Sequence, residues 1–285
     1  MKKIIPFLVV SIIAVVFVFS CKKDDVDNIQ SQYGQQLTVS KDYAFAQWVY
    51  AEAFQLVTQG LNNSTLMGGT STTIGGAQVT YSAALAQMQF VWTSKSSGRS
   101  GGFTAQMNDK DLSDSLFSCT VNYNNYMVDG TKIEGTNVYE NEGTYSDSKG
   151  LGLKFKFQFL NARIIKATDT VTFNANMNIL WKDGLLTLMN PADDVFYIWG
   201  AVNGSSSITG NSYQVAVNNT NKLKLANCQW VVGGEVDMVL NTKDSATQQP
   251  VVTNALIDFI NSDNCNNQVR LVINGLEYSF PMSGQ

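Results

Sequence analysis

Histidine is absent from all 285 residues of the chain. This absence excludes Ser-His-Asp and Cys-His catalytic groups, zinc held by imidazole, and acid–base catalysis by imidazole. Carboxylate pairs, lysine, tyrosine and oxygen-bound calcium remain available. We therefore expect a protein that acts by binding rather than as an enzyme, and we expect no cofactor.

Charged residues are also scarce, at 15% of the chain against about 25% in an average domain. The formal net charge is −4, and it becomes more negative once a leader containing Lys2 and Lys3 is removed. Binding to nucleic acid needs a basic surface that displaces counterions, so we expect no nucleic-acid partner. Apolar residues make up 44% of the chain and include 15 Phe, 11 Tyr and 5 Trp, enough for a sizeable core.

The first residues follow the order of a secretory signal. Two lysines precede an apolar run from Ile4 to Phe19, which is shorter than the roughly 20 residues of a spanning helix. The motif Val18-Phe19-Ser20-Cys21 also resembles the lipobox of bacterial lipoproteins, in which the cysteine becomes the lipidated first residue. We therefore predict a signal peptide over residues 1–20 and lipidation of Cys21. The alternatives are an ordinary secretory signal and an uncleaved anchor.

The remaining chain is predicted to consist of a tether and one domain. Residues 21–36 have little apolar content and predict a flexible, lipidated tether, whereas residues 37–285 are expected to form a single β-rich domain. A helix is predicted over residues 40–60, with Ser40 as its N-cap and Gly60 as its C-cap. Its apolar side chains recur at three- and four-residue spacing, which favours a helix covering a sheet over a helix that binds a partner or lies on a membrane.

From residue 117 onward the apolar pattern alternates, as in strands with one dry face, most clearly over residues 151–159 and 171–181. Three dipeptides, Asp129-Gly130, Asp183-Gly184 and Asn274-Gly275, predict tight type I′ hairpin turns. We therefore predict a mainly β fold, an antiparallel meander that forms a curved sheet or open barrel with the one N-terminal helix packed on it. A two-sheet β-sandwich is the alternative.

Three cysteines remain once Cys21 is assigned to the lipid, and an exported protein keeps its cysteines in an oxidising compartment. Cys228 and Cys265 both lie in the C-terminal block of strands, so they are the pair we favour for a disulfide. Sequence does not fix the connectivity, and three buried free thiols, with Cys119 as the third, are the alternative.

Five short segments between about Tyr123 and Phe280 carry a resemblance to a known family. They are Asn125–Thr136 (NYMVDGTKIEGT), Trp181–Gly184 (WKDG), Cys228–Gly234 (CQWVVGG), Ile257–Phe259 (IDF) and Cys265–Gly275 (CNNQVRLVING). They resemble an uncharacterised family of lipid-anchored proteins from Bacteroidetes-type bacteria. The resemblance implies the fold and the location but no activity. Relatives usually carry an Asp after the second of these cysteines, where this chain has Asn266, so we expect no acid or metal site there.

The location is specified further by Lys23-Asp24-Asp25. A lysine followed by two acids resembles the export signal of surface lipoproteins in such bacteria. The resemblance implies an outer-membrane protein that faces the cell exterior, and a periplasm-facing anchor is the alternative.

Carboxylates and tryptophans are the remaining candidates for chemistry. A glycosidase would need two carboxylates about 5–9 Å apart, but solvated acids are the favoured interpretation of the acidic residues near the 129–130 turn. Neither group of neighbouring aspartates has the spacing of an EF-hand, so no metal is expected. Tryptophans that are exposed together would stack on sugar rings. The three sets are Glu134, Glu140, Glu142 and Asp147; Asp109, Asp111, Asp114, Asp193 and Asp194; and Trp48, Trp92, Trp181, Trp199 and Trp230.

The functional prediction is a non-catalytic binding or envelope-assembly module of the outer membrane. Its partners would be the membrane, through the N-terminal lipid, and a glycan, protein or lipid ligand. A carrier that holds a lipid or other apolar ligand inside a half-barrel is the first alternative. A carboxylate-dependent glycan hydrolase is the second.

Overall fold

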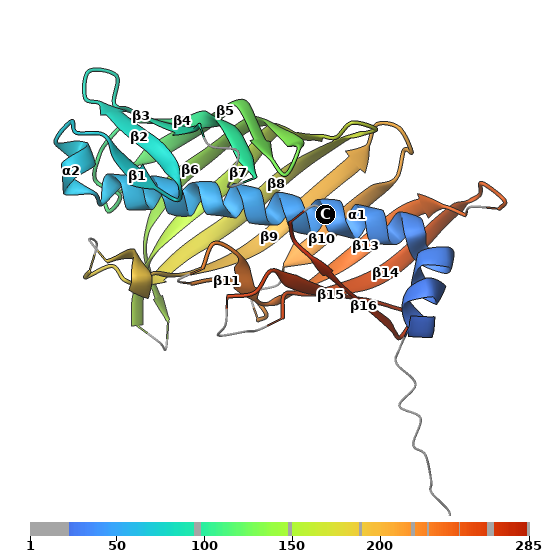
Figure 1. The fold of residues 1–285 in the computed structure, drawn as a ribbon. Coiled ribbons are helices and arrows are strands. Elements are labelled where there is room, and N and C mark those ends of the chain that lie inside the picture. Colours follow the sequence, from blue (N-terminus) through green and yellow to red (C-terminus); the bar gives the residue numbers. More distant parts are fainter. Residues whose placement is uncertain are drawn as a thin grey trace, which may run out of the picture.

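The alternating apolar residues line one face of a long antiparallel sheet that curves but does not close (Figure 1). Strand accounts for 57% of the computed structural model and helix for 16%. The curved sheet with an N-terminal helix is therefore confirmed, and the sandwich is excluded because the described strands belong to one sheet. The structure describes residues 23–93, 98–147, 150–187, 190–217, 220–226, 228–244, 246–260 and 265–283.

Neighbouring strands in the sequence are mostly neighbours in the sheet. The order runs from β1 to β10 without interruption and continues through β13 to β16, while β11 pairs with β9 and β12. The strands are β1 (Thr72–Ile74), β2 (Ala77–Ser82), β3 (Gln87–Trp92), β4 (Arg99–Met107), β5 (Ser118–Val128), β6 (Thr131–Asp147), β7 (Gly150–Ile165), β8 (Thr170–Asp183), β9 (Val195–Ser206), β10 (Ser212–Val217), β11 (Leu223–Leu225), β12 (Val231–Gly233), β13 (Glu235–Lys243), β14 (Pro250–Asp258), β15 (Gln268–Ile273) and β16 (Leu276–Pro281).

Two of the three predicted hairpin turns are present. Asp129 and Gly130 have φ of 48° and 77°, and Asn274 and Gly275 have φ of 50° and 81°, as a type I′ turn requires at both central positions. The third prediction, Asp183-Gly184, is wrong. Strand β8 ends at Asp183, but β9 begins only at Val195, after a short 3₁₀ helix, η2 (Pro191–Asp193).

The loop after β8 is held by a side chain rather than by a two-residue turn. The indole Nε1 of Trp181 donates a hydrogen bond of 3.1 Å to Oδ1 of Asp194. A Cβ atom on Gly184 would lie 2.1 Å from that same Oδ1, so only glycine allows this close approach. Gly184 is therefore needed for close packing against Asp194.

The main helix, α1 (Lys23–Leu61), is longer than predicted, and α2 (Ser64–Met67) follows it. Non-helical dihedrals at Tyr33 divide α1 into two parts. The predicted flexible tether through residue 36 is thus corrected, because the chain is helical from Lys23 and Gln36 is buried. The amide Nε2 of Gln36 donates to Oγ1 of Thr242 over 3.0 Å, which fixes this part of the helix to the sheet.

Neither predicted cap of the helix is a cap. Ser40 lies inside α1, where its hydroxyl donates to the carbonyl oxygen of Gln36 over 2.9 Å. Gly60 also lies inside the helix, and a Cβ atom there would lie 2.5 Å from Sδ of Met88. Gly60 therefore allows the helix to approach β3 closely.

The helix is buried on every side, which differs from the single apolar stripe that the sequence predicts. Every residue from Asp42 to Thr58 is buried, so this part of α1 is the core of the curved sheet rather than a cover on its surface. Helix rings interlock with rings of the concave face. Tyr50 packs against Phe159 and Phe173 at centroid distances of 4.5 and 5.0 Å, and Phe54 packs against Phe155 at 5.2 Å.

Charged side chains of the buried helix are paired with cations from the sheet and its loops. Nη2 of Arg99 donates to both carboxylate oxygens of Glu52, at 2.8 and 2.6 Å, and both side chains are buried. The Arg99 guanidinium also lies 5.6 Å from the ring centres of Trp48 and Trp92. Burial raises the pKa of Glu52, and Arg99 opposes that shift. These contacts let a charged residue sit in the middle of an apolar core.

Removing the cation of this pair would leave Glu52 buried without a partner. We expect Arg99→Ala to lower the free energy of unfolding by about 3–5 kcal/mol. Arg163→Ala is the matched control, because its ion pair with Glu134 is half-exposed, and we expect a loss below about 1 kcal/mol. Urea unfolding followed by tryptophan fluorescence measures both values. Similar losses in the two variants would show that the Glu52–Arg99 pair does not hold the helix.

Candidate functional site

An apolar groove opens at the end of the sheet where α1 finishes. It has a volume of about 1150 Å³ and is bounded by α2, the loop that follows β4, strand β7 and the loop that follows β8. Two leucines in it are strongly exposed, with Leu186 at 100% and Leu151 at 66% of their maximal area. Its apolar lining residues are Leu61, Met67, Leu112, Leu151, Leu153, Trp181, Leu185 and Leu186.

The lining of this end groove also includes charges of both signs. They are Asp109, Lys110, Asp111, Lys182 and Asp183. A mostly apolar lining with some charged residues suits a ligand whose body is apolar and whose end is polar, because each part then meets a matching surface.

The aspartates near the end groove shape its loop. Oδ1 of Asp109 accepts from the backbone N–H of Asp111, and Oδ1 of Asp111 accepts from that of Ser113, each over 2.9 Å. The hydrogen bonds from Ser113 lower the pKa of Asp111. Asp114 in turn accepts from the N–H of Leu116 over 2.7 Å. In the described ranges no three His, Cys, Asp or Glu side chains gather as a metal site would require.

A second opening, the polar cleft, lies beside the helix. Two adjoining hollows of about 480 and 250 Å³ share Gln59, Gly75, Pro191 and Asp194. Glu52, Gln55 and Gln59 of α1, and Asn62 just after its end, reach it at three- and four-residue spacing. This row of polar residues within an apolar helix is visible in the sequence and indicates the cleft. The sequence analysis did not identify it.

The carboxyl group of Asp194, which lines the polar cleft, has a raised pKa. Burial raises its pKa to about 6, and the hydrogen bond from Trp181 acts in the opposite direction. The side chain is buried at the wall of an open cleft, so solvent moderates its effect on stability.

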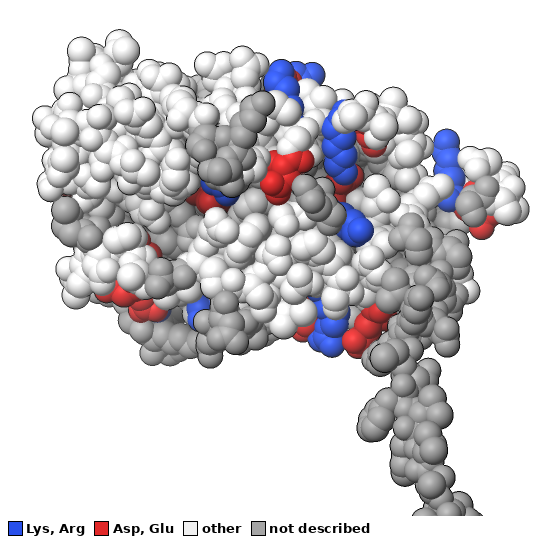
Figure 2. All heavy atoms as spheres, in the orientation of Figure 1, with Lys and Arg blue, Asp and Glu red and all other residues white. Residues whose placement is uncertain are grey.

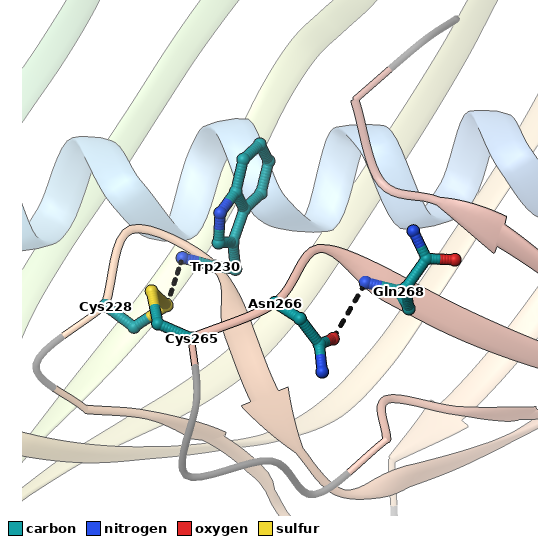
Figure 3. The surroundings of a disulfide bond; sticks show 5 residues. All are labelled: Cys228, Trp230, Cys265, Asn266 and Gln268. Atoms are coloured by element: carbon teal, nitrogen blue, oxygen red, sulfur yellow. Dashed lines mark hydrogen bonds between the residues drawn. A yellow bond between two sulfur atoms is a disulfide. The ribbon is translucent and has the colours of Figure 1, made fainter.

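The predicted cysteines Cys228 and Cys265 lie together in a disulfide beside the polar cleft (Figure 3). The backbone N–H of Trp230 donates to Sγ of Cys228 over 3.4 Å, and its ring packs on Trp48 of α1 at 4.2 Å. Asn266 accepts from the N–H of Gln268 over 3.0 Å, so this residue forms a turn. The disulfide thus holds a loop against the helix.

The other cysteines have different settings. Cys119 is a buried free thiol, and burial raises its pKa, so it has little thiolate character. Cys21, the predicted site of lipidation, lies outside the described residues. The lipid anchor therefore stays a prediction.

The remaining sequence candidates do not come together. Trp48, Trp92 and Trp181 are buried, so the five tryptophans form no common stacking surface. Glu142 pairs with Lys154 at 2.6 Å, as cross-strand neighbours on the outer face of the sheet do. Glu140 likewise pairs across strands with Lys156 at 3.9 Å, and Glu134 pairs with Lys132 of its own strand at 2.6 Å. The side chain of Asp147 is outside the described part.

No protein-family model, no curated protein and no solved structure matches this chain. The resemblance to the lipid-anchored family therefore stays a prediction. Among the described residues, no helix has both the length and the hydrophobicity of a membrane span.

The raised pKa of Asp194 predicts how stability changes with pH. Between about pH 4 and pH 6 the folded protein binds this proton and the unfolded chain releases it, so stability falls as pH rises. We expect the free energy of unfolding of Asp194→Asn to exceed that of the wild type by about 1–2 kcal/mol at pH 8 and to equal it at pH 4.

The asparagine keeps an oxygen that accepts from Trp181, so the variant isolates the charge. Asp193→Asn is the control, since it removes a neighbouring exposed charge. Denaturant titrations at the two pH values provide the measurement. A variant that is less stable than the wild type at pH 8 would contradict the assignment.

Proposed function

We propose that the protein is a non-catalytic binding module of the outer membrane, anchored by a lipid on Cys21, that takes an apolar ligand in the end groove. The observation that carries the proposal is the end groove itself, in which exposed leucines surround a space of about 1150 Å³. Exposed apolar patches of this kind mark binding sites in soluble domains.

The position of the groove fits presentation away from a membrane. Helix α1 starts at one end of the sheet and finishes at the other, next to α2 (Figure 1). At ~1.5 Å per residue, about 40 Å of helix separates Tyr33 from Leu61 at the groove. A lipid two residues before α1 would therefore lie at the opposite end from the ligand. Lys23-Asp24-Asp25 favours placement on the cell exterior.

The packing of α1 favours this groove over the inside of the half-barrel. The concave face is filled by buried helix residues, and an apolar ligand there would have to displace Tyr50 and Phe54 from their ring contacts. The end groove needs no such displacement. A carrier function, if the protein has one, would use the end of the sheet.

Ion pairing favours binding over glycan hydrolysis. Glu134, Glu140 and Glu142 each have a cationic partner on the outer face, whereas a hydrolase needs two carboxylates facing each other across a cleft. The face in Figure 2 shows small groups of acidic and basic side chains among uncharged residues, which suits a contact surface of mixed polarity.

Two leucines of the same strand allow a matched test of the end groove. Leu151 lines the groove, whereas Leu160, also in β7 and 47% exposed, does not. We expect Leu151→Asp to weaken binding of the apolar fluorophore N-phenyl-1-naphthylamine at least about tenfold, because a charge would lie in the apolar lining. Leu160→Asp should bind as the wild type does. The measurement is a fluorescence titration of the domain lacking residues 1–21, and equal affinities in both variants would contradict the proposal.

The anchor has a separate test. We expect Cys21→Ala to abolish incorporation of labelled palmitate and to release the protein from the outer-membrane fraction, because the thiol is the acceptor of the lipid. Cys119→Ala, which changes a buried thiol inside the fold, should leave both properties intact. Unchanged labelling of Cys21→Ala would show that another group anchors the protein.

A further inference from the structure

The polar cleft beside α1 is independent of the end groove and has the features of a built site. Its larger hollow measures about 480 Å³, within the range of pockets for small molecules. One wall is the polar row of α1 and the other is formed by η2 and the disulfide loop. A helix and a disulfide-linked loop thus border the space.

Polar side chains with free hydrogen-bonding atoms line this cleft. Gln55 is only 7% exposed, and its amide forms no hydrogen bond with the part of the chain that the structure describes. Asp194 is 6% exposed, and among the described residues its only side-chain hydrogen bond is the one that Oδ1 accepts from Trp181. Neither the Gln55 amide nor Oδ2 of Asp194 is a fully buried atom without a partner, so these atoms face the cleft, where a ligand can bond to them.

The charges of the polar cleft restrict the class of ligand. The described lining contains no lysine or arginine, and the carboxylate of Asp194 would repel an anion. A divalent cation would need several free carboxylates, but both oxygens of Glu52 accept from Arg99. The class of ligand that fits these charges is therefore uncharged.

The hydroxyl groups of a ligand would match the free hydrogen-bonding atoms of the cleft. Each glutamine amide both donates and accepts, and the free oxygen of Asp194 accepts, which is the complement of a ligand whose hydroxyls do both. Leu56, Pro191, Ala192 and Phe196 supply apolar contacts in the same hollow. Polar groups combined with apolar C–H faces are characteristic of sugar rings.

We propose that the polar cleft binds an uncharged sugar through Gln55, Gln59 and Asp194. The site acts by binding and not by hydrolysis. A two-carboxylate mechanism needs a second free acid, and Arg99 holds both oxygens of Glu52.

Two helix glutamines give a pair of variants. Gln55 lines the cleft, whereas Gln47 does not line it and has amide atoms that are fully buried without a partner among the described residues. The full lipoprotein in phospholipid nanodiscs is titrated with glucose, galactose, N-acetylglucosamine and maltose in a calorimeter. We expect at least one of these sugars to bind, with an affinity at least about tenfold weaker in Gln55→Leu and unchanged in Gln47→Leu.

A second variant distinguishes a loss of sugar binding from a loss of folding. Gln59→Leu changes a partly exposed side chain and should weaken sugar binding while the circular dichroism spectrum and melting temperature stay those of the wild type. The proposal is overturned if none of the sugars binds up to roughly 50 mM, if Gln59→Leu binds as the wild type does, or if calcium or inorganic phosphate binds the cleft instead. We expect Gln55→Leu and Gln59→Leu to leave binding of N-phenyl-1-naphthylamine in the end groove unchanged, so the two proposals fail separately.

Discussion

The fold depends on a long helix that fills the concave side of a sheet unable to cover itself. The sheet curves without closing, so its apolar face needs another element, and α1 supplies it with interlocking rings such as Tyr50 and Phe54. A helix buried on all sides must neutralise its own charges. Arg99 does so for Glu52, and Lys166 contacts Asp42 in the same way near the other end of the buried segment. Both cations come from the sheet and its loops, so the ion pairs fix the helix within it.

Both candidate binding sites lie where the helix and sheet cease to cover each other. The end groove opens where α1 finishes at Leu61, and the polar cleft opens along the side of α1 between β1 and η2. Their chemistry follows from the residues left uncovered, leucines at the end and amides along the side. The disulfide between Cys228 and Cys265 borders the cleft and, through Trp230, packs a loop on Trp48. The same helix thus organises the core and the two surfaces that we propose for binding.

Local patterns in the sequence predicted the sheet, but contacts between distant residues were beyond them. Alternation over residues 171–181 and the Asp129-Gly130 and Asn274-Gly275 turns depend on near neighbours, and the structure has them. The prediction of a turn at Asp183-Gly184 was wrong because the indole of Trp181 donates a hydrogen bond to Asp194, which lies further along the chain, and a longer loop forms. The helix was expected to expose one face because its apolar residues recur along one stripe. Asp42 and Glu52 are nevertheless buried, because their partners Lys166 and Arg99 come from far along the chain. The polar cleft was missed for the same reason, since its second wall comes from residues after 190.

Native-state hydrogen exchange along α1 tests most directly whether the helix is the core of the sheet. Amides of a buried central helix exchange only when the whole domain unfolds, whereas those of a helix on a surface exchange through local opening. The account predicts that amides from Asp42 to Thr58 exchange with the free energy of global unfolding, as slowly as those of β6, β7 and β8. Exchange of this segment at a free energy well below that of these strands would contradict it.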